Sequence, residues 1–392
     1  MGKLDLFARF IIQIVKGKNM KLLIAGDFCP YDRIVTAFEK ENYGSVLSEV
    51  QLITSTVDYS FVNLECPVLS GDANPIKKHG PSLRCSPKGI NALKYAGFDC
   101  VTLANNHFRD FGDSGVKETI EALKENGIEH VGGGVNIAEA SKVLYKEIAG
   151  HRLAIINCCE NEFSIATENR GGSNPLNPLR QYRDIREARQ KADYVVVIVH
   201  GGHEQFQLPS PRMVETYRFF VDVGADAVVN HHQHCYSGYE VYNAKPIFYG
   251  LGNFCFDSPD HRSGDWTEGY FVTIDFSETI QFELHPYCQC ADKPEVVSLP
   301  KYSFDEKLCE LNAIIADSVR LRDAVEKYYA GSASVYKSIF EPFYNRYCIA
   351  ARIRGFFPSF MSKKRKLAAQ NYVCCEAHRD KLMWWLNHDD KN

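Results

Sequence analysis

Polar side chains of the kinds that bind metal ions stand at the ends of five apolar, strand-like segments. The stretch NHHQHCYSG (230–238) places His231, His232 and His234 directly after the strand-like run DAVVN. The other four segments end in Asp27, in Glu65, in Asn105-Asn106-His107 and in His200. Ligands bind at the carboxyl ends of the strands in open α/β sheets, so we expect these side chains to converge on one site. His232 and His234 are two residues apart, so on an extended backbone both point the same way.

These residues form an oxygen-and-imidazole ligand set without a thiolate. The expected metal ligands are Asp27, Glu65, Asn106, His200, His232 and His234. Such a set suits Mn, Fe or Zn and differs from the thiolate-rich sites of structural zinc. A carboxylate such as Glu65 can bridge two ions about 3.5–4 Å apart, an arrangement that activates a shared water. The sequence therefore predicts a centre for divalent metal ions, one or two in number.

His107 is expected to remain outside the ligand set. It follows Asn106 immediately, so the two side chains diverge at a strand end and are not expected to bind the same ion. Asn106 would hold metal while His107 donates a proton to a leaving group. Asp110 is expected to orient the imidazole and to raise its pKa. The structural alternative is a polar turn that precedes a helix.

Other polar residues are candidates for substrate contacts. In KKHGPSLRCSP (77–87), the side chains of Lys78, His79 and Arg84 could hold a carboxylate or a phosphate, or could form a solvated basic loop. Glu160 and Glu162 follow the strand-like run LAIINCC and could either hydrogen-bond ligand histidines or contact an amine. Glu204, in VHGGHE, is a further candidate contact.

The elements that position these residues follow an alternating pattern. Strand-like runs alternate with segments of helical period, which predicts an α/β architecture with a buried sheet. Two helices are expected after Ser86-Pro87 and after Ser210-Pro211, ending near Gly97 and Gly224. EGYFVTIDF and IQFELHPYC predict an antiparallel hairpin, and the chain beyond about Asp292 is mainly helical. We therefore expect an amphipathic helix over 1–19, the main domain over 20–291 and a helical extension over 292–392.

Composition limits the location and the partners. The chain has 392 residues and a net charge of −4, so no global basic field favours nucleic acid. The 14 cysteines include no CxxC pair and many lie in apolar runs, which is typical of reduced thiols in a cytoplasmic protein. Segment 1–19 is expected to dock on the protein or to lie on a membrane surface. The basic run 363–366 is either a solvated helix start or a contact for anionic lipid. The oligomeric state is open.

Beyond these patterns, the chain resembles a known family. The segments AGDF, FVNLE, GFDCVTLANNH, VHGGHE, GADAVVNHHQH and GYEVYNAKPIFYGLGNFCFD occur in the order typical of the CapA family of poly-γ-glutamate capsule biosynthesis. That family belongs to the calcineurin-like metallophosphatase superfamily, and the resemblance covers roughly residues 20–258. It implies a four-layer α/β/β/α sandwich. It also places the functional positions of the family on Asp27, Glu65, Asn106, His107, His200 and 230–234.

The resemblance leaves the number of metal ions open. Phosphatase relatives carry Asp-x-His at the end of the first strand, whereas this chain, like the family, has Asp27-Phe28-Cys29 there. One metal position is therefore a ligand short, and one, two or no ions are all compatible with the motifs.

Three functions follow from these observations. The first is metal-assisted hydrolysis of a phosphoester or an amide in a capsule or cell-envelope polymer, on a small-molecule, peptide or polymer substrate. The second is metal-free acid/base catalysis on a peptide by Asp27, Glu65, His107 and His234. The third is a non-catalytic component of a polymer assembly machine, with the terminal helices as membrane or partner contacts.

The cysteine pattern generates a first prediction. Because nothing in the sequence indicates export, thiol titration of the denatured protein should find all 14 cysteines free. A substantially lower count would place the protein in an oxidising compartment.

Overall fold

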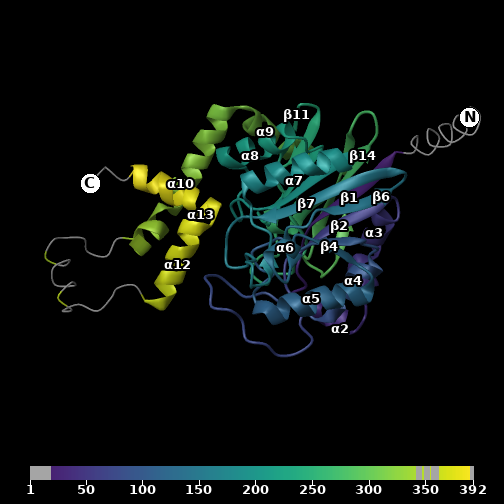
Figure 1. Ribbon diagram of the computed structural model, residues 1–392, viewed down its shortest axis with the longest axis horizontal. Helices are drawn as coiled ribbons and strands as arrows, with labels where there is room; N and C mark the ends of the chain where they lie inside the picture. Colours follow the sequence, from purple (N-terminus) through teal and green to yellow (C-terminus); the bar gives the residue numbers. More distant parts are fainter. Residues whose placement is uncertain (1–18, 341–346, 348–353, 355–361, 389–392) are drawn as a thin grey trace, which may run out of the picture.

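The computed structural model describes residues 19–340, 347, 354 and 362–388. The expected N-terminal helix over 1–19 lies outside them, apart from Asn19. Figure 1 shows a body of two sheets with helices outside, and a helical C-terminal segment against one end of the body.

The first sheet carries most of the strands that lead to the predicted site. Its order is β16-β15-β14-β1-β2-β3-β4, with β13 also pairing with β1. The strands are β1 (Met20–Phe28), β2 (Tyr59–Leu64), β3 (Cys100–Thr102), β4 (Glu129–Val131), β13 (Asn253–Cys255), β14 (Glu268–Phe276), β15 (Gln281–Gln289) and β16 (Val296–Ser298). Strands β1 to β4 run parallel, so their carboxyl ends share one edge.

The second sheet has the order β11-β12-β10-β9-β7-β6. Its strands are β6 (Leu144–Ile148), β7 (His151–Cys159), β9 (Tyr194–His200), β10 (Ala227–His231), β11 (Tyr239–Tyr242) and β12 (Lys245–Phe248). Strands β7, β9, β10 and β12 are parallel, and a separate two-stranded sheet pairs β5 (Gly133–Gly134) with β8 (Gly172–Ser173).

Helices cover the outer face of each sheet. The body contains α2 (Arg33–Glu39), α3 (Gly44–Thr54), α4 (Pro87–Tyr95), α5 (Gly112–Asn126), α6 (Ile137–Ala140), α7 (Pro178–Lys191) and α8 (Pro211–Asp222), and 3₁₀ turns at Gly264–Thr267 and Lys301–Phe304. The later helices are α9 (Asp305–Ala316), α10 (Ser318–Phe340), α12 (Lys363–Cys374) and α13 (Glu376–His388). The basic run 363–366 thus begins α12, with the Ser362 side chain accepting a hydrogen bond from the Arg365 N–H at 3.3 Å.

Successive side chains of β1 belong alternately to two different hydrophobic cores, which explains why the sheets stack. Leu22 and Ile24 belong to the core that also contains the second sheet, whereas Leu23 and Ala25 belong to the core beneath α2 to α5. Successive side chains of a strand point to opposite faces, so a strand with no polar break must be covered on both sides. Between the sheets, the rings of Tyr194 and Phe276 lie 4.9 Å apart. The predicted four-layer α/β/β/α sandwich is confirmed.

The two expected proline-led helices begin where predicted, although their serines act differently. α4 begins at Pro87 and α8 at Pro211. The Ser210 hydroxyl accepts a hydrogen bond from the Met213 N–H at 3.3 Å, as a cap does. The Ser86 hydroxyl instead donates to the Glu39 carboxylate at 2.6 Å.

The hairpin and the thiols also agree with the sequence. β14 and β15 pair antiparallel. β16 extends that sheet beyond Ala291, the expected end of the main domain. Every cysteine that the structure describes is a free thiol. In the described residues, no helix combines the length and the apolar character needed to cross a bilayer.

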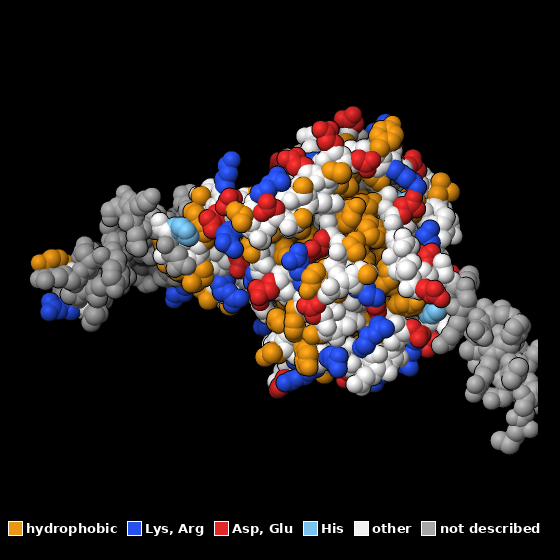
Figure 2. Space-filling model, turned by 90° about the horizontal axis from the view of Figure 1, so that it is seen from above, with side chains coloured by type: hydrophobic (Ala, Val, Ile, Leu, Met, Phe, Trp, Pro, Cys, Tyr) orange, Lys and Arg blue, Asp and Glu red, His pale blue; other side chains and the backbone are white. Residues whose placement is uncertain are grey.

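On the face shown in Figure 2, Lys and Arg side chains are interspersed with Asp and Glu side chains, with apolar groups between them. A mixed surface of this kind creates no field of a single sign on that face.

Gly26 permits a close backbone approach beside the predicted site. The register between β1 and β2 shifts between Ala25 and Asp27, as at a β-bulge. A Cβ atom on Gly26 would lie 1.9 Å from the Gly252 carbonyl oxygen, which accepts a hydrogen bond from the Asp27 N–H at 3.2 Å. The missing side chain lets the two segments meet directly before Asp27.

Gly26→Ala should therefore destabilise the fold by about 3 kcal/mol or more, or prevent folding, because backbone rather than a movable side chain blocks the methyl group. Thermal unfolding measures this change. Gly71→Ala is the matched control, because a Cβ there meets no atom within 4 Å. Equal melting temperatures for the two variants would contradict the packing argument.

Candidate metal centre

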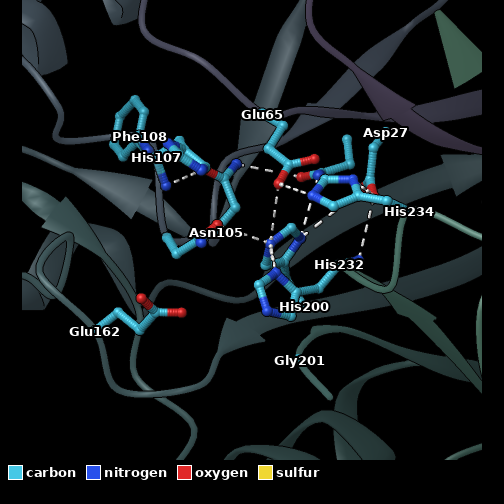
Figure 3. A network of polar contacts seen from close by, with 12 residues as sticks. Asp27, Glu65, Asn105, His107, Phe108, Glu162, His200, Gly201, His232 and His234 are labelled. Carbon is cyan, nitrogen blue, oxygen red and sulfur yellow. Dashed lines mark hydrogen bonds and ion pairs between the residues drawn. The ribbon is translucent and has the colours of Figure 1, made fainter. Parts of the chain in front are cut away.

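The predicted ligands meet where the carboxyl edges of the two sheets face each other. Asp27 lies in β1, Glu65 directly follows β2, and Asn106 lies in the turn after β3. His200 ends β9, and His232 and His234 follow β10. Figure 3 shows the side chains of Asp27 and Glu65 and those of His200, His232 and His234 pointing toward one another.

The first ligand group contains Glu65, His200 and His232. Their ligand atoms lie within 4.8 Å of one another, and all three residues are buried. His200 Nε2 is 3.5 Å from Glu65 Oε1 and 3.0 Å from His232 Nδ1. The Asn106 side-chain oxygen lies 3.1 Å from the same His200 nitrogen. An amide oxygen, a carboxylate and two imidazoles thus surround one point.

The second ligand group contains Asp27, Glu65 and His234. His234 Nδ1 is 3.7 Å from Asp27 Oδ2, and His234 Nε2 is 3.7 Å from Glu65 Oε1. Glu65 belongs to both groups, as a bridging carboxylate does. The site therefore offers two adjacent groups that could hold divalent cations, joined by Glu65.

Glu65 is the residue whose surroundings most favour a cation. Its side chain is fully buried, and neither carboxylate oxygen has a hydrogen-bond partner among the described residues. Burial, together with the nearby Asp27 carboxylate, raises the pKa of Glu65 well above its usual range. A buried carboxylate without a donor is costly, and a cation would compensate for it. The donor set and the orphaned carboxylate fit a metal centre.

Two asparagines that were not predicted as functional fix the orientation of the ligands. The Asn63 side-chain amide donates to Asp27 Oδ1 at 2.7 Å and lies 3.2 Å from His200 Nδ1. The Asn253 side-chain oxygen lies 2.9 Å from His234 Nδ1. Contacts of this kind orient an imidazole and select its tautomer. The sequence signal was present in FVNLE and GLGNF, but their roles depend on neighbours from other strands.

The paired asparagines after β3 have separate tasks. The Asn105 side-chain oxygen accepts hydrogen bonds from the N–H groups of His107 (3.1 Å) and Phe108 (2.8 Å), and its amide donates to the Leu64 carbonyl at 2.8 Å. Asn105 thus shapes the turn, and Asn106 faces His200. The doubled asparagine thus supplies one residue to the turn and one to the candidate site.

The expectation that His232 and His234 stand on extended backbone is wrong. β10 ends at His231, and the backbone then turns with φ of 96° at His232 and 56° at His234. Left-handed φ values are unfavourable for residues with side chains, so this turn stores strain beside the site. The His232 N–H donates to Asp27 Oδ2 at 3.2 Å, which holds the turn against β1.

His107 is held as expected, but its pKa is not shifted as expected. His107 Nδ1 lies 2.7 Å from Asp110 Oδ2, so Asp110 does orient the ring. Lys78 Nζ lies 3.1 Å from the same ring nitrogen and also pairs with Asp110. Burial and the charge of Lys78 lower the pKa of His107, outweighing Asp110, which raises it. The opposing effect comes from the loop that brings Lys78 to the ring.

The predicted basic cluster is divided by the structure. Lys78 is buried beside His107, with its side chain 4% exposed. His79 packs edge-on against Tyr372 of α12, with ring centroids 5.8 Å apart. Arg84 is exposed, and its guanidinium lies 5.9 Å from the centre of the Phe111 ring. Only the first of the three reaches the candidate proton donor.

Glu160 has a different environment from the one expected. One carboxylate oxygen accepts from Arg212 at 2.7 Å, and the other accepts from the Ala377 N–H of α13 at 3.1 Å. The residue therefore fastens the C-terminal helix, and its hydrogen bonds go neither to a ligand histidine nor into open space. Glu204, in contrast, is exposed and lines a cavity next to His232.

The protein is an α/β protein with two facing sheets. Their strand ends bring six side chains into one buried cluster around Glu65, which is a candidate metal centre. The model of the bacterial capsule synthesis protein family, PGA_cap, matches residues 21–258. Because that match covers more than half of the chain, the chain belongs to this family.

Similar proteins agree with this membership. The capsule biosynthesis protein CapA of Bacillus anthracis is 33% identical over 64% of this chain and 63% of its own length. The PGA biosynthesis protein CapA of Bacillus subtilis is 32% identical over 58% of this chain and 60% of its own. The aligned region is thus less than two thirds of either relative. A solved structure of a candidate 5′-nucleotidase from Staphylococcus aureus aligns over 76% of this chain and 58% of its own, with 14% identity and a TM-score of 0.42.

Replacement of Glu65 by Gln should have opposite effects with and without metal. In chelator, Glu65→Gln should be at least as stable as the wild type, because it replaces a buried carboxyl group that lacks a hydrogen-bond donor by an uncharged amide of similar size. With Mn²⁺ or Zn²⁺ added at about 100 times the wild-type Kd, the wild type should gain about 2.7 kcal/mol and the variant much less.

Melting temperatures in both conditions provide the measurement. The control is Glu168→Gln, which changes an exposed carboxylate. Equal metal stabilisation of Glu65→Gln and the wild type would show that Glu65 is no ligand.

Proposed function

We propose that the protein is a metal-dependent hydrolase or transferase that acts on a phosphoester or an amide in a capsule or cell-envelope polymer. The observation that carries this proposal is the buried Glu65 carboxylate, which has no donor and belongs to two adjacent ligand groups. The same observation disfavours metal-free acid/base catalysis by an ionised Glu65, because without a cation burial and Asp27 raise the pKa of this carboxyl group and favour its neutral form.

The proposed ligands are the six strand-end residues named from the sequence. Asp27, Asn106, His200, His232 and His234 would surround one or two ions together with Glu65. The absence of thiolates favours Mn, Fe or Zn in a catalytic role. Bound there, divalent ions would polarise the bond under attack and lower the pKa of a bound water.

The chain's own proton carrier would be His107. Hydrolysis breaks a P–O or C–N bond and leaves an oxygen or a nitrogen that takes up a proton. Asp110 fixes the ring through Nδ1, so Nε2 is the nitrogen that remains to exchange a proton with the substrate. The lowered pKa of His107 means that the free site favours the neutral ring, and an anionic substrate would shift it toward the charged form.

The family supports a proposal for the substrate class. The relatives are named for capsule and PGA biosynthesis, which supports a peptide or polymer substrate for this chain as well. The basic start of α12 would be the contact with anionic lipid if the protein works at a membrane surface.

Two histidine variants test the assignment of roles. His107→Ala should keep the metal and the fold but lower turnover by roughly 10²-fold or more, since it removes a group that acts on the proton. His232→Ala should lose metal, because it removes a ligand that lies 3.0 Å from His200. Metal content and turnover are measured together, on the substrate that a screen of phosphoesters and γ-glutamyl peptides yields.

The outcomes separate the alternatives. If His107→Ala loses as much metal as His232→Ala, His107 is itself a ligand. If wild-type protein purified without chelator contains no metal, the metal-dependent proposal fails. His261→Ala is the control, because His261 stacks on Trp266 at 4.7 Å and belongs to neither ligand group.

A further inference from the structure

A cavity of about 260 Å³ opens beside the candidate metal centre. Its wall includes His232 from the site, Glu204 from the loop after β9, and Tyr328, His378 and Lys381 from α10 and α13. The C-terminal residues lie outside the region that the family model matches, which ends at residue 258. The C-terminal helices α10 and α13, outside the matched region, thus form part of the cavity wall.

Fixed contacts dock the C-terminal helix on the body. Arg212 of α8 binds Asp380 at 2.9 Å and Glu160 at 2.7 Å, and Glu160 also accepts from the Ala377 N–H. The Asn161 N–H donates to Glu376 at 2.7 Å. Because these contacts bind the first turns of α13, they set the position of Lys381 in the cavity wall.

Lys381 is held in place but has no anionic partner at ion-pair distance among the described residues. Its ammonium group donates to the Tyr328 hydroxyl at 2.8 Å and lies 4.3 Å from the centre of that ring. The Tyr328 hydroxyl donates to the Glu204 carbonyl at 3.2 Å, and its ring stacks on Phe206 with centroids 4.0 Å apart. A lysine fixed in this way has already lost much of its conformational freedom, which favours ligand binding.

Glu204 supplies the opposite charge in the same cavity. No cation lies within ion-pair distance of its carboxylate among the described residues, and it is exposed to the cavity. Burial lowers the pKa of Lys381 to about 8, and the charge of Glu204 opposes that effect. At neutral pH the cavity therefore presents one positive and one negative side chain that do not touch each other.

A ligand that satisfies both charges must itself carry both. A phosphate or a simple carboxylate would pair with Lys381 but would be repelled by Glu204. An amine would pair with Glu204 and be repelled by Lys381. We infer that the cavity binds the amino-acid end of a substrate, with its ammonium group at Glu204 and its carboxylate at Lys381.

This inference deepens the proposed function, since it rests on substrate reaching the metal centre at His232. The ammonium-carboxylate end would lie in the cavity, and the bond to be cleaved would lie toward the strand-end ligands. Lys381 and Glu204 would act in binding and selectivity, and neither would carry out the chemical step.

Calorimetric titration of the full chain with three matched probes tests the inference. The probes are alanine, alaninamide, which lacks the carboxylate, and N-acetylalanine, which lacks the ammonium group. Alanine should bind at least about tenfold more tightly than either analogue, because each lost charge-assisted contact costs about that factor. Inorganic phosphate should bind no more tightly than N-acetylalanine.

Each variant should affect one end of the ligand. Lys381→Met should weaken the binding of alanine by about tenfold or more and leave the affinity for alaninamide unchanged. Glu204→Gln should weaken the binding of alanine by a similar factor and leave the affinity for N-acetylalanine unchanged. Lys124→Met and Glu168→Gln, both at exposed positions, are the charge-matched controls and should bind alanine as the wild type does. Lys381→Arg should restore most of the affinity, which separates charge from folding.

The titrations measure equilibrium binding, so they do not depend on turnover, and they are run both in chelator and with metal. If the protein binds no metal but still prefers alanine to the two analogues, this inference stands and the proposed function fails. Unchanged alanine affinity in both cavity variants overturns the inference. Tighter binding of phosphate than of alanine, lost in Lys381→Met, also overturns it and identifies a simple anion site.

Discussion

The structure depends most on one buried carboxyl group that no hydrogen bond among the described residues satisfies. Glu65 lies where the two sheets face each other, and ring nitrogens of His200 and His234 lie 3.5 and 3.7 Å from its Oε1, beyond a hydrogen bond. Isolating a carboxylate from water costs several kcal/mol, so a fold that retains one needs compensation from elsewhere. The surrounding side chains are arranged for that compensation: carboxylate, amide and imidazole groups face Glu65, and the asparagines behind them fix their orientation.

The same demand explains the irregular backbone around the site. Regular strands bring side chains to the sheet edge but do not orient three imidazoles toward one point. The bulge at Gly26 and the left-handed turn at His232 and His234 provide this orientation. Each left-handed residue costs about 1–3 kcal/mol, which the rigid parallel strands beneath it sustain. Two of the nine described non-glycine residues with positive φ are predicted ligands, His232 and His234.

Much of this could be predicted from the sequence, because it depends on local patterns. Alternating apolar runs indicate the strands, and Pro211 after Ser210 marks a helix start. The strand-end ligands follow from the rule that parallel strands end at one edge. The pKa shift of His107 could not be predicted, because Lys78 reaches the ring from a separate loop. The role of Glu160 was equally hidden, since its partners Arg212 and Ala377 are distant in sequence.

The C-terminal helices show why a family motif and a substrate preference need not occupy the same part of a chain. The predicted ligands lie at or directly after the ends of rigid strands, and all of them lie within the region matched by the family model. The far wall of the cavity has no such requirement, and here it comes from Tyr328 and Lys381. Because Arg212 and Glu160 hold α13 through its first turns, residues further along the helix can change without disturbing the metal ligands. In the proposed function, the sandwich would supply the chemistry, and the C-terminal extension would supply the substrate contacts.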